Sequence, residues 1–196
     1  MKLIIIRHGE TEDNVKGLLQ GHKHGKLTKT GIEQARKLAF RLKDEEIDAI
    51  YSSDLQRAKD TTEEIAKFHK VPIHYTSELR EQHLGIFEGK PKDELRKTRG
   101  KRGLLVTEFK PKGGESLAEL KERAQRFLNM LFKMHTKETI LISSHAAFIM
   151  MLLGIILNKS IEEAFKLGQS NACVNIIEIK ENSKHKVHAI NCIKHL

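Results

Sequence analysis

Hydrophobic positions along the chain switch between short continuous runs and helical spacing, and this pattern predicts strands that alternate with helices. Residues 3–6 form an unbroken run of Leu and Ile, which is typical of a strand that is covered on both faces. Residues 172–179 and 186–193 are predicted to form a C-terminal β-hairpin that turns at Asn182 and Ser183. Similar short runs predict further strands at residues 47–51, 72–75 and 139–143.

Helical spacing of apolar residues fills the segments between these strands. Thr28 and Thr30 are both candidate N-caps of a helix that runs to about Leu42, with Ile32 on its apolar face. Residues 146–157 are predicted to be a buried helix, because this apolar stretch is shorter than the roughly 20 residues that a membrane span needs. Side-chain caps or a starting proline predict further helices from Ser53 to about 69, from Pro91 to about 98, from Ser116 to about 135, and after Ser160.

The alternation of strands and helices predicts an α/β fold with three α/β/α layers around a mainly parallel sheet. The chain has 196 residues, and since most domains contain about 100–200 residues, we expect a single domain over residues 1–196. Between residues 81 and 114 the periodicity weakens, and charged residues and glycine take over. This segment is therefore predicted to be an insertion.

Two of the predicted strands end in a histidine. Residues 3–6 are followed by Arg7 and His8, and residues 139–143 are followed by Ser144 and His145. In sheets of this kind, ligands bind at the carboxyl ends of the strands. If the two strands are neighbours, His8 and His145 lie at one site.

The motif Arg-His-Gly-Glu-Thr at residues 7–11 directly follows the first strand. It resembles the opening motif of the histidine phosphatase superfamily, whose relatives include cofactor-dependent phosphoglycerate mutase, and the resemblance continues in order to about Ala172. The chain departs from the family's pattern at residues 24–26, and at Ala146 and Ala147, where relatives usually have two glycines. The other matching positions are Asn14, Gln20-Gly21, residues 27–35, 52–61 and 79–89, Gly114-Glu115-Ser116 and Ser144-His145.

The resemblance implies a phosphoglycerate mutase-like fold and a metal-independent phosphomonoester hydrolase that works through a phosphohistidine on His8. Glu81 would protonate the leaving oxygen and later activate water. Arginine forks and a cationic His145 would stabilise the transferring phosphoryl group, so that neither a metal nor a cofactor is implied. The residues that would bind the phosphate are Arg7, Asn14, Gln20, Gly21, Arg57, His145 and, through its backbone N–H, Ala146.

The net positive charge of the chain favours an anionic partner. The chain contains 35 Lys and Arg against 26 Asp and Glu, so its formal net charge is +9. Residues 90–102 carry seven basic and two acidic side chains, and by the resemblance their insertion borders the mouth of the active site. This basic cluster either steers anionic substrates toward the site or is simply a solvated helix face.

Two alternative functions stay open. A cofactor-dependent phosphoglycerate mutase is the nearest, although the short insertion favours hydrolysis. A nucleic-acid-binding module, from another class, would use the positive charge, but the chain has only 5% aromatic residues and no recognisable nucleic-acid-binding motif. The sequence identifies neither the small phosphorylated substrate nor the oligomeric state.

Cysteine and histidine content bears on location and metal binding. With two cysteines and no apolar signal segment at its start, the chain is expected to be cytoplasmic, with no membrane association. Cys173 and Cys192 would face each other if the hairpin turns as predicted, although reduced thiols are the default in that compartment. His22 and His24 lack the spaced ligand partners of a metal site, so no metal is predicted.

Overall fold

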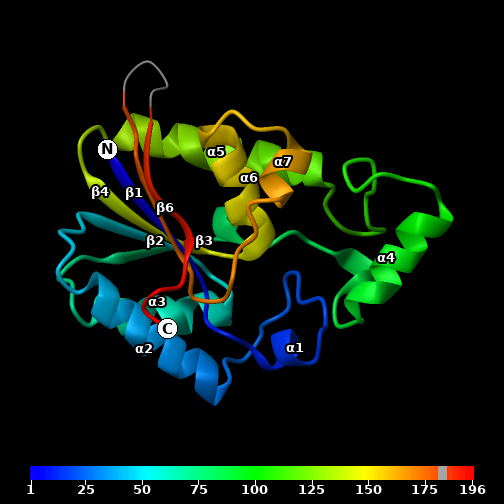
Figure 1. The fold of residues 1–196 in the computed structure, drawn as a ribbon, viewed down its shortest axis with the longest axis horizontal. Coiled ribbons are helices and arrows are strands. Elements are labelled where there is room, and N and C mark those ends of the chain that lie inside the picture. The colour runs from blue at the N-terminus through cyan, green and yellow to red at the C-terminus, as the bar shows by residue number, and fades with distance from the viewer. Residues whose placement is uncertain (181–184) are drawn as a thin grey trace.

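A six-stranded sheet at the centre of the molecule carries helices on both faces (Figure 1). In the computed structural model, which describes residues 1–180 and 185–196, the strand order is β3-β2-β4-β1-β5-β6. The first four strands in this order are parallel, and β5 and β6 are antiparallel, so the predicted mixed α/β architecture is confirmed. The strands are β1 (Lys2–Arg7), β2 (Ala49–Ser53), β3 (Ile73–Thr76), β4 (Thr139–Ser144), β5 (Val174–Glu178) and β6 (Lys186–Cys192).

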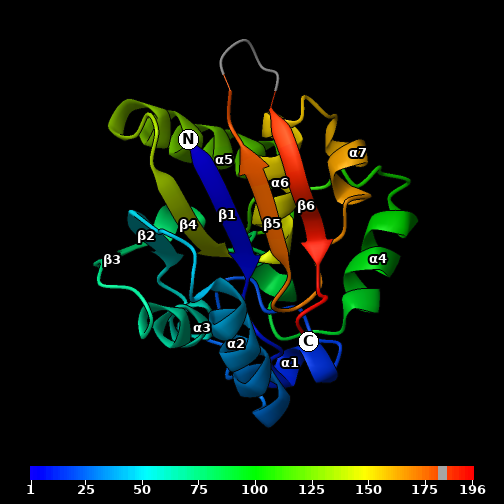
Figure 2. The same ribbon diagram turned by 60° about the vertical axis from the view of Figure 1, so that its left-hand side comes forward.

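The helices form two layers that the sheet separates (Figure 2). Leu3 and Ile5 of β1 pack with one helical layer, and Ile4 and Ile6 pack with the other, because successive side chains of a strand point to opposite faces. This double coverage explains the unbroken apolar run at the start of the chain. One layer contains α2 (Lys29–Leu42) and α3 (Gln56–Ala66), the other α5 (Leu117–Met134), α6 (Ala146–Ile156) and α7 (Ile161–Phe165), while α1 (Glu12–Val15) follows β1.

Two helices differ in part from the prediction. Thr28, one of the two candidate N-caps, begins α2, and its hydroxyl accepts a hydrogen bond from Gly31 N at 2.9 Å, but Ile32 is 39% exposed rather than buried. Gly31 and Ala35 occupy the inward positions of the helix, and this leaves Ile32 turned toward solvent. The predicted cap at Ser53 was wrong as well: this residue ends β2, and α3 begins later with no side-chain cap. By contrast, the predicted caps at Ser116 and Ser160 are both confirmed.

At the C-terminus, β5 and β6 pair in antiparallel fashion, and this confirms the predicted hairpin strands. The predicted turn at Asn182 and Ser183 lies outside the described residues. Cys192 is opposite Val174, not Cys173, because register shifts interrupt the ladder, and both cysteines are free. The facing arrangement that a cross-strand bridge would need is therefore absent, and the default of reduced thiols holds for these two residues.

The segment that contains α4 (Lys92–Lys101) leaves the three layers and returns to its starting point (Figure 1). At its neck, Ile86 N donates a hydrogen bond to Lys112 O at 3.1 Å. Gly85, with φ of +52°, lies so close to the same carbonyl that a side chain there would collide with it. A small apolar cluster of its own, which includes Phe87 and Phe109, holds the segment together.

Among the described residues, no helix has both the length and the apolar character that a membrane crossing requires.

Candidate active site

The carboxyl ends of β1 and β4 bring the two predicted histidines together. The two strands are parallel neighbours, with Arg7 beside Ser144, so the next residue of each strand enters the same site. The ring centroids of His8 and His145 are 5.1 Å apart, and the rings are 2% and 0% exposed. The expectation that they meet is confirmed.

The His8 ring is fixed in one orientation. Its Nδ1 lies 2.7 Å from Gly9 O, and because a carbonyl oxygen only accepts, Nδ1 carries the proton and Nε2 carries the lone pair. Arg57 Nε donates to that Nε2 at 3.3 Å. Burial, together with the positive charges of Arg57 and Arg7, lowers the pKa of His8 well below its usual value. His8 is therefore a neutral imidazole whose lone pair points toward arginine.

The two arginines are buried beside this ring. Arg57 is 1% exposed and donates to Gly21 O at 2.9 Å and to Lys23 O at 2.7 Å. Burial lowers the pKa of Arg57 to about 10, which still leaves it cationic at neutral pH. Arg7 donates to Gln169 O at 2.6 Å, and its buried Nε–H has no partner among the described residues. Such an unsatisfied cationic donor is suited to an anion.

His145 is fully buried. Its Nε2 is 2.8 Å from the hydroxyl of Ser53, and burial together with the nearby Arg57 lowers its pKa well below the usual value. Without an anion in the site, His145 is therefore neutral, and the expected cationic form requires the negative charge of a bound phosphate.

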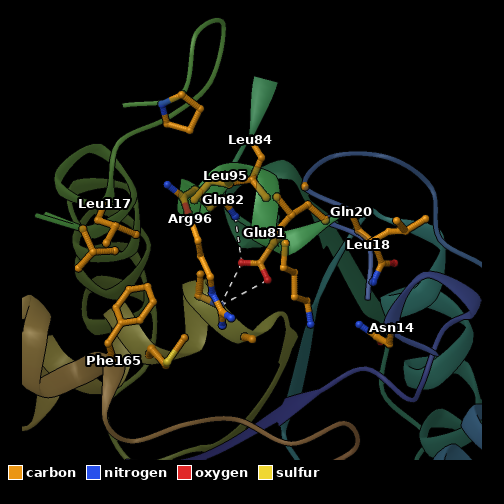
Figure 3. Close-up of a pocket in the computed structure, with 18 of the residues that line it drawn as sticks. Asn14, Leu18, Gln20, Glu81, Gln82, Leu84, Leu95, Arg96, Leu117 and Phe165 are labelled. Atoms are coloured by element: carbon orange, nitrogen blue, oxygen red, sulfur yellow. Dashed lines mark hydrogen bonds between the residues drawn. The ribbon is translucent and has the colours of Figure 1, made fainter. Parts of the chain in front are cut away.

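A cavity of about 440 Å³ opens above these groups (Figure 3). Its walls include all the predicted site residues except His145, which is fully buried. Gly21, with φ of +51°, approaches Glu88 so closely that a side chain there would collide with it. The predicted residues in the wall are Arg7, His8, Asn14, Gln20, Gly21, Arg57, Glu81 and Ala146.

Glu81 stands in the middle of the cavity (Figure 3). Its Oε1 accepts hydrogen bonds from Ala147 N at 3.0 Å and Phe148 N at 3.4 Å, both in the first turn of α6. A third bond comes from Gln82 N at 3.0 Å. The two alanines that replace the family's usual glycines thus still offer a backbone donor, and here Ala147 uses it to hold Glu81.

Arg123 of α5 supports Glu81 and was missed in the sequence. Its buried guanidinium donates to the carbonyls of Glu78 at 2.7 Å, Arg80 at 2.8 Å and Glu81 at 3.1 Å. It also forms an ion pair with Glu115 at 2.8 Å. A charged residue on the apolar face of a helix is the signal that could have found it, because such residues are rarely buried without a partner.

Asn171 is a second missed residue. Its side-chain amide donates to His8 O and Gly9 O, both at 3.2 Å, and to Asn14 Oδ1 at 3.0 Å. It therefore joins the loop after β1 to the residues before β5. No local pattern marks this asparagine.

The two histidines considered for metal binding do not converge. His22 Nε2 lies 2.9 Å from Glu81 O, and His24 is exposed. Across residues 1–180 and 185–196, no group of three or more His, Cys, Asp or Glu side chains is arranged to hold a metal ion.

Comparison with known proteins gives consistent matches. A family model, the histidine phosphatase superfamily (branch 1), matches residues 3–192. A broad-specificity phosphatase of Saccharomyces cerevisiae is 34% identical over all of this chain and 87% of that protein. A metal-independent phosphoserine phosphatase of Arabidopsis thaliana is 32% identical, over 92% of this chain and 77% of that protein.

A solved structure is similar as well. The crystal structure of a putative alpha-ribazole-5'-P phosphatase from Escherichia coli has a TM-score of 0.90 at 26% identity, over 98% of this chain and 96% of that chain. Proteins named as phosphoglycerate mutase-like or probable phosphoglycerate mutase also match, at 31% and 32% identity.

Proposed function

We propose that this chain, which belongs to the histidine phosphatase superfamily, is a phosphomonoester hydrolase that forms a covalent phosphohistidine on His8. One observation carries the proposal: the buried His8 ring keeps its proton on Nδ1, so Nε2 presents a lone pair beside the cations Arg7 and Arg57. A neutral nucleophile among fixed positive charges is what attack on a phosphate dianion needs. Relatives that are phosphatases of small phosphorylated metabolites support the same class of reaction.

In the first step, His8 Nε2 forms a bond to phosphorus while the bond from phosphorus to the ester oxygen breaks. Arg7 and Arg57 bind the non-bridging oxygens, and the phosphate dianion favours a protonated His145 behind them. Glu81 gives its proton to the leaving alcohol, which departs toward the open part of the cavity.

In the second step, water attacks the phosphorus of phospho-His8. Glu81 now takes a proton from that water, the bond from phosphorus to His8 Nε2 breaks, and inorganic phosphate leaves. Backbone N–H groups of α6 hold the carboxylate of Glu81 in the cavity, and this supports its role in both steps.

A rapid-quench experiment with a ³²P-labelled ester tests the covalent step. We expect phosphate on the protein that is stable to base and labile to acid, which is the behaviour of a phosphohistidine. His8→Ala should lower turnover by at least about 10⁴-fold, since removal of a nucleophile disables the whole catalytic unit. His188→Ala, at an exposed histidine of β6, is the matched control and should keep full turnover. An active His8→Ala enzyme would refute the mechanism.

We also propose that the protein is cytoplasmic. A further point of the proposal is that the reaction needs no metal ion. Arg7 and Arg57 supply the positive charge that a metal would otherwise provide, and one relative is named a metal-independent phosphatase. Dialysis against EDTA should leave turnover unchanged. Loss of turnover that a single divalent metal restores would contradict this part.

A mutase is the second candidate, favoured by the relatives with that name. The two functions differ in the acceptor of the phosphoryl group, which is water in a hydrolase and a second substrate hydroxyl in a mutase. Release of inorganic phosphate and isomerisation of 3-phosphoglycerate, measured side by side with a bisphosphate cofactor present, separate them. We expect release to dominate.

A further inference from the structure

The cavity has a second half that the phosphoryl group does not need. In Figure 3, Asn14 and Gln20 lie on one side of Glu81, and Leu117 and Phe165 lie on the other. A volume of about 440 Å³ is in the range of sites that hold drug-sized ligands, so the leaving group has ample space. Because Glu81 protonates the leaving oxygen, it stands where the phosphate ends and the rest of the ester begins.

Outside the phosphate-binding residues, the wall of the cavity consists mainly of apolar side chains. Seven of them come from the segment around α4, the start of α5, and the helices α6 and α7. A substrate body rich in hydroxyl groups would lose hydrogen bonds to water there without gaining partners, which costs about 1–3 kcal/mol for each unsatisfied group. An apolar body gains from the same walls. The apolar residues in question are Leu84, Leu95, Val106, Phe109, Leu117, Met150 and Phe165.

The same wall also carries positive charge. Lys92, Arg96 and Arg99 of α4 all line the cavity, and Glu81 is the one acid among the described lining residues. Arg96 is 3.5 Å from Asp93, whereas Arg99 forms no ion pair within residues 1–180 and 185–196. Arg99 is also only partly exposed. Its guanidinium is therefore free to bind a second anionic group.

From these observations we infer the substrate class: a phosphomonoester whose leaving group has an apolar body and ends in a second anion, a carboxylate or a phosphate, that Arg99 binds with help from Arg96. The inference rests on the proposed hydrolase function. Binding of the second anion by Arg99 differs from long-range electrostatic steering. It requires direct contact with the substrate, so it depends on which arginine lines the cavity.

Three esters, all of primary alcohols, test the two parts of this inference with similar leaving-group chemistry. They are 4-carboxybenzyl phosphate, its neutral isostere 4-carbamoylbenzyl phosphate, and 6-phosphogluconate, which has a carboxylate on a hydroxyl-rich body. We expect kcat/KM to fall by about tenfold from the first to the second, the loss of one charge-assisted contact. We expect 6-phosphogluconate to be at least about tenfold poorer than the carboxybenzyl ester.

Two variants then separate contact from general charge. Arg99→Gln should abolish the higher kcat/KM of the carboxylate ester relative to the carboxamide ester. The change should be in KM and not in kcat, because the contact is the same in the ground state and the transition state. Arg102→Gln is the matched control: it removes the same charge just beyond the end of α4, at an exposed residue outside the cavity wall, and should keep the advantage. Arg99 is on a helix with no buried residues and Arg102 is its exposed C-cap, so folding is not at risk.

Each outcome decides something. Equal hydrolysis of the carboxylate and the carboxamide by the natural enzyme, or equal losses in the two variants, would overturn the role of Arg99. A preference for 6-phosphogluconate over the benzyl esters would overturn the apolar body. If none of these esters nor p-nitrophenyl phosphate releases phosphate, the hydrolase itself is wrong, and the substrate class falls with it.

Discussion

His8 and Arg57 line the cavity, and His145 lies next to the His8 ring; these three residues, the floor of the site, are at most 2% exposed, whereas α4, the outer wall, contains no buried residue. Each floor side chain is bonded to backbone or to another buried group. The wall's own ion pairs, such as Lys90 with Glu94 and Arg96 with Asp93, join exposed side chains and so contribute little to stability.

The difference shows two ways of handling a phosphate ester. The floor must keep charges at fixed positions, and it does so by burial, which shifts the pKa of both histidines and of Arg57. The wall only has to recognise the rest of the substrate, and flexible, solvated side chains suffice for that. We therefore expect floor variants to affect all esters alike, and wall variants to affect them selectively.

The largest effect is expected from Arg57→Lys in the floor. A lysine cannot donate to Gly21 O and Lys23 O while also gripping phosphate oxygens with a planar fork. We expect kcat/KM to fall by about 10²–10³-fold for every ester, and urea unfolding to show a loss of about 2 kcal/mol. Arg102→Lys, at an exposed residue just beyond α4 and outside the cavity wall, is the control. An effect that is strong for one ester and weak for another would contradict the expectation that floor variants affect all esters alike.

The next largest effect is expected at Arg123, which donates a hydrogen bond to the Glu81 carbonyl and so positions this residue for proton transfer. Arg123→Gln should slow a primary alkyl ester by about 10–100-fold and p-nitrophenyl phosphate far less, since nitrophenolate leaves without help from an acid. Combined with Glu81→Gln, it should cause little further loss on the alkyl ester.

Arg126→Gln, on the exposed face of the same helix, is the matched control for Arg123. Equal slowing of both esters by Arg123→Gln, with a lower melting temperature, would reduce Arg123 to a stabilising role without influence on proton transfer.

The free energy of unfolding should depend on pH because of the two buried histidines of the floor, His8 and His145. The folded-state pKa of His8 and of His145 is well below 6.5, so below about pH 6.5 the unfolded chain binds protons that the folded chain does not. The free energy of unfolding should then decrease by about 1 kcal/mol for each histidine between pH 7 and pH 5.5.

Urea unfolding across this range measures the slope. The His145→Gln variant should have a smaller slope, and saturating inorganic phosphate should reduce the slope of the natural protein, because an anion in the site favours the protonated ring. A stability that is constant from pH 7 to pH 5.5 would contradict the account of the floor.

The smallest effect is expected from charge at a distance. Lys97 and Arg102 belong to the basic cluster but not to the cavity wall. Changing both to Glu should lower kcat/KM for multiply charged esters by about twofold at low ionic strength, with the difference lost at high salt, where charges are screened beyond a few ångströms. A loss of kcat/KM that persists at high salt would show that these side chains contact the substrate and belong to the wall.

Much of the fold and of the floor could be predicted from the sequence, because both depend on local patterns. The apolar runs of β1 and β4 require a sheet covered on both faces, and the histidine after each run is brought to the same edge once these strands are parallel neighbours. The family motif added Arg57 and Glu81, and both line the cavity with His8.

Features that depend on contacts between distant residues could not be predicted in this way. Arg123 binds carbonyls more than 40 positions away, and Asn171 reaches back to Asn14. The depth of His145, which leaves it outside the cavity wall, follows from packing on Ser53 and not from its own motif. The hairpin register was wrong because bulges leave no mark in an alternating pattern.

The neck between Ile86 and Lys112 makes the α4 segment an interchangeable module. Its two ends are joined by a backbone hydrogen bond, and residues 89–92 also pair with residues 17–19, so a segment of another length that keeps these contacts can start and finish at the same points. Doubling the length of such a loop costs only about 0.6 kcal/mol of closure entropy. Grafting α4 segments from relatives onto this neck is thus a practical route to enzymes that keep one reaction and exchange one substrate for another.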